Sequence, residues 1–273
     1  IIRVAFDCSI WLCNRTLQKK IHSKDIPIAI IARSGYGREE LYFQSNLKVQ
    51  IISRGGQTKE TKQVVKHLEY LFIHQSIFQN LINASYTSIE SLEKELGGNK
   101  TIDLLALLEG RLIVGNSDIY LKFLKTVKKA SLLQNENLLN YCYEHNNYYE
   151  VSNTVFQQEP NVKEELNRLY WALTLARLKH DLKNTNQFEL LDELLTNSLI
   201  SVSAFKKIQS SLAFLSKVRL HLHCEQKGSY RDMMSYEVRE NIAQSMGYEV
   251  KKFFHKYFYE AAYPLKKYSR NIF

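Results

Sequence analysis

The spacing of apolar residues changes at Gly97-Gly98, and this change constrains the fold more than any other feature of the chain. Before the two glycines, short apolar runs predict strands, whereas after them every long segment has the 3.6-residue period of an amphipathic helix. Ten Gly and three Pro in 273 residues are too few for the many tight turns of a sandwich or barrel. The sequence therefore predicts an α+β fold, with a small mixed-sheet domain over residues 1–98 and an all-helical domain over residues 99–273.

Three strands are expected in the first domain. Residues 27–32 (PIAIIA) form a short Ile-rich run typical of a buried strand. Residues 47–53 (LKVQIIS) alternate apolar residues with Lys48 and Gln50, which predicts a strand with one polar face. A third strand is expected near residues 78–84. Helical periodicity predicts one helix over residues 1–20 and another that begins at Thr58.

The second domain is expected to consist of helices alone. The segments with helical periodicity are residues 102–114, 119–145 with a break near Gln134, 162–180, 188–197, 204–223, 236–246 and 250–268. The residues expected to cap them are Asn161, Ser203 and Ser235 at N-termini, and Gly115 and Gly247 at C-termini.

Composition narrows the function classes. The hydrophobic fraction of 45% and the charged fraction of 24% are typical of a folded protein, and no apolar run is long enough to span a membrane. The net charge of +9 permits attraction to nucleic acid, acidic proteins or phosphates. Because the basic residues are spread along the predicted helices, we expect a solvated surface rather than a nucleic-acid-binding face.

The first residues of the chain and the spacing of the cysteines predict a soluble cytoplasmic protein. Ile stands in the first position instead of Met, and Arg3 and Asp7 interrupt the opening apolar run, which is typical of a trimmed chain and not of a secretory signal. The four cysteines contain no CxxC pair, so neither a disulfide scaffold nor a zinc ribbon is indicated. His221 and His223 are two positions apart on a predicted helix and therefore point to different faces, which disfavours a metal site.

A resemblance to a known family is carried by residues 29–49, AIIARSGYGREELYFQSNLKV. A strand, a turn of small residues and a second strand form the layout of polymerase-β-like nucleotidyltransferases. Within that superfamily, GYGREEL at residues 35–41 followed by Ser45 resembles the PII uridylyltransferase/uridylyl-removing enzymes, whose pattern is GGYGRGEL, four residues, then Asp-x-Asp. Without the neighbouring motifs, Gly35 to Arg38 would be read only as a tight turn.

The resemblance implies a phosphate-binding turn and a pair of Mg²⁺-binding carboxylates, which nucleotidyl transfer requires. The two carboxylate positions fall on Asn46 and Lys48, so one charge is lost and the other is reversed. No catalytic residue, no metal ligand and no Mg²⁺ are therefore expected, although a nucleotide can still bind. The residues that would contact it are Ser34, Gly35, Gly37, Arg38, Ser45, Asn46 and Lys48.

The helical half resembles the same family. Residues 104–116, the segment EPNVKE at residues 159–164, and VR-x-x-LH (Val218, Arg219, Leu222, His223) match family segments in order and spacing. The Gly-rich GPGGLRD segment that borders the family's active site is replaced at residues 165–171 by ELNRLYW. The weaker matches lie at residues 242–248 and 253–261. The family's phosphohydrolase and ligand-sensing domains are not in these residues.

Three functions remain open from the sequence. The first is a degenerate nucleotidyltransferase that acts as a regulatory module by binding a nucleotide or a protein partner. The second is an active transferase that uses acids elsewhere in the chain, and the third is a structural subunit of a larger assembly.

Overall fold

The structure is a computed structural model that describes residues 28–42, 45–55, 62–63, 65–66, 70, 82–97, 101–151, 159–226, 232–270 and 272. Its contacts divide the chain into two compact units. The first unit comprises Ile1–Leu41 and Ser45–Asn135, and the second comprises Tyr42–Gln44 and Glu136–Phe273. The helix expected over residues 1–20 and most of the one expected from Thr58 lie outside the described residues.

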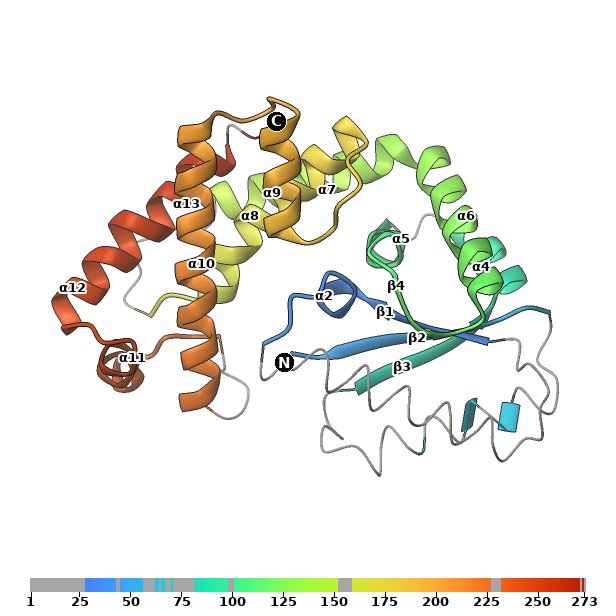
Figure 1. Ribbon diagram of the computed structural model, residues 1–273, viewed down its shortest axis with the longest axis horizontal. Coiled ribbons are helices and arrows are strands. Elements are labelled where there is room, and N and C mark those ends of the chain that lie inside the picture. The colour runs from blue at the N-terminus through green and yellow to red at the C-terminus, as the bar shows by residue number, and fades with distance from the viewer. Residues whose placement is uncertain are drawn as a thin grey trace. The chain divides into compact units, whose positions relative to one another are not determined.

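The first unit contains a four-stranded mixed sheet (Figure 1). Its strands are β1 (Ile28–Arg33), β2 (Leu47–Ser53), β3 (Ile82–Ser88) and β4 (Arg111–Gly115), in the order β3-β2-β1-β4. β1 is antiparallel to both β2 and β4, whereas β2 and β3 are parallel. The predicted mixed sheet is confirmed. β2 has the predicted bounds, β1 lies one residue later than expected, and β3 begins four residues later.

The fourth strand corrects the prediction of a single helix over residues 102–114. Helix α5 (Thr101–Leu108) ends early, and β4 pairs with the edge of β1. Gly115 was expected to cap a helix, but it ends the strand with φ of 120°, where a Cβ would collide with the backbone of Ile28. Because β4 joins the sheet, the first compact unit extends to Asn135, beyond the domain boundary predicted at residue 98.

The two faces of the sheet have different coverings. One face buries Ile28, Ile30, Val49 and Ile51 together with Val65. On the other face lie α4 (Ile89–Leu96), α5 and α6 (Ser117–Leu133), and both α4 and α5 pack against α6 (Figure 1). Gln50 points to this second face and is only 5% exposed. The polar face expected for β2 is therefore buried at Gln50.

The second unit is helical, as predicted. Its elements are α7 (Asn135–Val151, which begins at the boundary), α8 (Val162–His180), α9 (Gln187–Thr196), α10 (Val202–Glu225), the 3₁₀-helix η1 (Tyr236–Val238), α11 (Arg239–Ser245), α12 (Val250–His255), the π-helix η2 (Lys256–Ala262) and α13 (Tyr263–Ser269). Helices α8, α10 and α13 pack around one core (Figure 1). None of the helices in the described ranges is long and apolar enough to cross a membrane.

Helix caps explain several of these bounds. The side chain of Asn161 accepts hydrogen bonds from the first turn of α8, as predicted. The N-cap of α10 is Ser201 and not Ser203, while Ser235 occupies the N-cap of η1 without a side-chain cap. Gly247 has φ of 77° and follows α11, where its N–H donates to Gln244 and the next N–H donates to Ala243. These two bonds form the glycine cap expected at that helix end.

Candidate functional site

The turn that follows β1 forms one helical turn, α2 (Ser34–Gly37), where the sequence predicts a loop. Ser34 and Glu39 have φ values of 55° and 67°. Glycine stands at both positions in the family pattern GGYGRGEL, and glycine adopts such a backbone without strain. This chain therefore keeps a left-handed conformation at both positions even though it lacks both glycines. The left-handed conformation at these two positions is a property of this fold and does not by itself require a ligand.

Gly37 permits the turn to lie against the end of α5. A Cβ at Gly37 would overlap the backbone oxygen of Glu109 and would come within 2.9 Å of the oxygen of Ala32. A Cβ at Gly35 would lie 3.3 Å from the backbone oxygen of Glu40, which is a tight but tolerable contact. Gly37 is therefore required by packing, whereas Gly35 is not.

Arg38 is held inside the first unit by two ion pairs. Its Nε donates to Glu40 at 2.8 Å and its Nη1 donates to Glu109 at 2.6 Å. The side chain of Arg38 is 15% exposed and that of Glu109 is 2% exposed. The guanidinium that was expected to face a phosphate thus joins the turn to the end of α5.

Asn46 and Lys48, at the two carboxylate positions of the family, are both exposed, and Ser45 is half-buried. In the sheet, Lys48 lies directly opposite Arg33 on β1 and beside Asn83 on β3. Residues paired in this way project from the same face of a sheet. This face therefore presents two cations and one amide, Arg33, Lys48 and Asn83, at the level where the family carries acids.

Arg33 was missed by the sequence analysis. It directly precedes the turn. Alternation along a strand shows which residues share a face, but only the register with β2 shows on which face of the sheet Arg33 lies. The register makes it a direct cross-strand neighbour of Lys48. In the part of the chain that the structure describes, no group of three His, Cys, Asp or Glu side chains is arranged to hold a metal ion.

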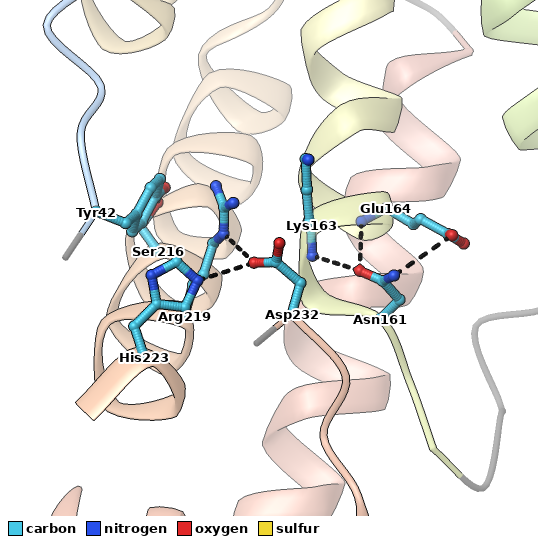
Figure 2. Close-up of polar contacts among 8 residues, drawn as sticks. All are labelled: Tyr42, Asn161, Lys163, Glu164, Ser216, Arg219, His223 and Asp232. Atoms are coloured by element: carbon cyan, nitrogen blue, oxygen red, sulfur yellow. Dashed lines mark hydrogen bonds and ion pairs between the residues drawn. The ribbon is translucent and has the colours of Figure 1, made fainter. Parts of the chain in front are cut away.

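A second polar cluster lies in the helical unit and is centred on Asp232 (Figure 2). One carboxylate oxygen of Asp232 accepts hydrogen bonds from Arg219 Nε at 2.7 Å and from His223 Nε2 at 2.9 Å. Arg219 and His223 are the two polar residues of the VR-x-x-LH segment, one helical turn apart on α10. Burial alone would raise the pKa of Asp232, but the hydrogen bonds from His223 and Arg219 outweigh burial and hold this pKa well below its usual range.

Tyr42 completes this cluster from a distant part of the chain. Its hydroxyl donates to Ser216 at 3.0 Å, and the guanidinium carbon of Arg219 lies 4.2 Å from the centre of its ring (Figure 2). The ring of His223 meets that of Tyr42 edge-on at 5.9 Å. Neither Tyr42 nor Asp232 was singled out from the sequence, because only the tertiary structure brings residues 42, 219 and 232 together. His221, in contrast, contacts Ser245 at 2.8 Å, so the two histidines have different partners.

The EPNVKE segment begins α8 and ties it to the strand-like segment around Asp232. Asn161 accepts from the backbone of Lys163 at 3.1 Å and of Glu164 at 3.2 Å (Figure 2). The N–H of Val162 donates to the backbone oxygen of Asp232 at 2.9 Å. The match to the family at this segment therefore corresponds to a helix start that positions Asp232.

Residues 165–171, which replace the Gly-rich GPGGLRD of the family, lie in the interior of α8. Glu165 and Arg168 form an ion pair of 3.0 Å, with side chains that are 4% and 2% exposed. Burial raises the pKa of Glu165, and Arg168 opposes this shift. A buried ion pair on a regular helix takes the place of a glycine-rich segment here.

Comparison with known proteins agrees with the motifs. The family model for GlnD PII-uridylyltransferase matches residues 142–272. The "bifunctional uridylyltransferase/uridylyl-removing enzyme" of Haemophilus influenzae (strain 86-028NP) is 26% identical over 235 residues, which are 83% of this chain and 26% of the relative. The enzyme of the same name from Zymomonas mobilis is 25% identical over 256 residues, which are 85% of this chain and 26% of the relative.

The matched regions extend over both compact units, although the chain spans only about a quarter of the length of these relatives. The order of the motifs along the sequence agrees with these matches. This chain therefore shares sequence motifs and extended sequence similarity with the PII uridylyltransferase family.

Proposed function

We propose that this chain is a degenerate member of the family that binds a nucleotide without metal, does not transfer a nucleotidyl group, and acts as a regulatory module. The name of the relatives describes transfer and removal of uridylyl groups. The observation that carries the proposal is the register of β1, β2 and β3, which places Arg33, Lys48 and Asn83 side by side on one face. Divalent metal catalysis of phosphoryl transfer needs carboxylates at such a place.

Electrostatics supports the loss of catalysis. Mg²⁺ prefers oxygen ligands, mainly carboxylates, and is repelled by a neighbouring ammonium or guanidinium. The described part of β3 has the sequence INASYTS and therefore offers no third acid. The ammonium of Lys48 can instead pair with phosphate oxygens directly.

A transfer assay tests the catalytic half of the proposal. We expect no labelled product when the protein is incubated with radiolabelled UTP, Mg²⁺ or Mn²⁺, and a PII-type protein as the acceptor. The variant Asn46→Asp with Lys48→Asp is expected to remain at background as well, because residues 165–171 also depart from the family pattern. Robust labelling by the unmodified chain would establish the alternative, an active transferase.

Measurement of UTP binding tests the nucleotide-binding part of the proposal. By calorimetry, we expect an affinity that does not depend on Mg²⁺ and falls with added salt, since the pairing of exposed charges is screened over about 8 Å at physiological ionic strength. Lys48→Ala is expected to weaken the affinity several-fold, whereas Lys125→Ala on α6, also an exposed lysine of the first unit, serves as the matched control. A tight Mg²⁺ site that Asn46→Ala abolishes would contradict the proposal.

A protein partner belongs to the same proposal, because the family description names the PII protein. Calorimetric titration with a PII-type protein tests it in the presence and in the absence of UTP. A structural subunit without any ligand predicts that UTP does not bind, so the UTP titration also separates this third function from the first.

A further inference from the structure

A cavity of about 280 Å³ lies within the first unit, between the sheet and the helices α4 and α5. Its floor is polar and consists of Arg33, Gln50, Ser85 and Thr87. Its walls combine two carboxylates with apolar side chains, which are Glu95, Asp103, Leu92, Leu96 and Leu107. None of the residues of the turn after β1 lines this cavity.

Arg33 reaches across the sheet into the cavity. It projects from β1, but its Nη2 donates to Ser85 on β3 at 3.1 Å, so the side chain crosses β2. Ser85 donates in turn to the side-chain oxygen of Gln50 at 2.8 Å. Gln50 is 5% exposed, and within the described chain its amide nitrogen donates to no other group. The floor of the cavity therefore offers oriented hydrogen-bond donors.

The charge of Arg33 is not compensated by an ion pair among the described residues. Its buried Nε has no hydrogen-bond partner in that part of the chain. Burial lowers the pKa of Arg33, while the charge of Asp103 across the cavity opposes this shift. Arg33 is half-buried and has no ion-pair partner among the described residues, so an anion that entered the cavity would gain both a charge partner and a hydrogen-bond donor.

We propose that this cavity binds a sugar phosphate, with the phosphate on Arg33 and the sugar hydroxyls directed to Asp103 and Glu95. A simple anion would pair with Arg33 but would be repelled by the two carboxylates. The hydroxyl groups of a sugar phosphate offset this repulsion because they donate hydrogen bonds to the carboxylates. The leucines contact the C–H faces of the sugar ring. The ligand is either a free sugar phosphate or the ribose phosphate of a nucleotide.

Calorimetry with three probes tests the site. Ribose 5-phosphate is expected to bind more tightly than inorganic phosphate, and ribose alone is expected not to bind. Arg33→Met should weaken the affinity for ribose 5-phosphate at least about tenfold, as the loss of a charge-assisted hydrogen bond predicts. Asp103→Asn should weaken binding of ribose 5-phosphate, because one acceptor oxygen for the sugar hydroxyls becomes a donor. It should not weaken binding of inorganic phosphate, because the substitution removes a charge that repels phosphate.

Controls separate this site from the proposed nucleotide site. Lys48→Ala should leave the affinity for free ribose 5-phosphate unchanged while it weakens UTP binding. If UTP displaces ribose 5-phosphate and Arg33→Met weakens both, the ribose of a nucleotide is the natural occupant. Ser85→Val, which removes the hydroxyl bound to Arg33 and narrows the cavity, gives a second test should Arg33→Met fail to fold. The cavity proposal is overturned if ribose 5-phosphate does not bind or if both variants bind it with unchanged affinity, whatever the result with UTP.

Discussion

Asp232→Ala is expected to lower the free energy of unfolding by about 3 kcal/mol. The substitution leaves Arg219 Nε and His223 Nε2 without their shared acceptor, and their side chains are 13% and 0% exposed. Loss of one partner from a buried pair usually costs about 3 to 5 kcal/mol. We place the expected value at the lower end of this range because Asp232 is 11% exposed and solvent can partly replace it. Urea unfolding measured by circular dichroism gives the change.

The control for Asp232 is Asp192→Ala, an exposed aspartate on α9. Its replacement is expected to change the free energy of unfolding by no more than about 0.5 kcal/mol. The cluster also predicts that Arg219 loses its position over Tyr42 in the Asp232 variant, which removes the stacking contact at 4.2 Å. Equal effects of the two aspartate variants would show that the cluster contributes nothing to stability.

The contribution of Asp232 to stability is also expected to depend on pH. Because its pKa is lower in the folded state than in the unfolded chain, its stabilising effect is complete above the unfolded value of about 3.9 and is lost as the pH falls through the folded value. The difference in unfolding free energy between the unmodified protein and Asp232→Ala should therefore shrink as the pH falls below about pH 4. A difference that grows on acidification would contradict this assignment.

Gly37→Ala is expected to destabilise the first unit by about 3 kcal/mol or more. The added methyl group would overlap the backbone oxygen of Glu109 and crowd that of Ala32, and neither oxygen can move without displacing β1 or the end of α5. The displacement would also disturb the ion pair between Arg38 and Glu109. Thermal unfolding should show the loss, and hydrogen exchange should place it in β1.

Gly35→Ala is the matched control, since it adds the same methyl group two residues earlier in the same turn. Its Cβ would lie 3.3 Å from the backbone oxygen of Glu40, a contact that a small shift relieves. We expect a change below about 1 kcal/mol for Gly35→Ala. If both alanine variants were equally stable, the glycine at residue 37 would not be explained by packing, and a role in ligand binding would become the better explanation.

Local sequence patterns were sufficient for much of the helical unit. The predicted helix over residues 162–180 has the bounds of α8, and Asn161 caps it as expected, because a capping side chain acts within one turn of the chain. The strand at residues 47–53 and the glycine cap at Gly247 were also recovered from local signals. The order of the short motifs likewise indicated the resemblance to the PII uridylyltransferase family without any coordinates.

Tertiary contacts decided the rest. Residues 111–115 (RLIVG) suit a strand or a helix equally by pattern, and they form β4 only because the edge of β1 offers unpaired backbone groups. Arg33 became a site residue through its register with Lys48, and Asp232 through hydrogen bonds to a helix that ends before it in sequence. Sequence alone therefore determined the local elements and the family resemblance of this protein, whereas the fold decided which charges meet, because electrostatic contacts depend on distances in space and not on separation along the chain.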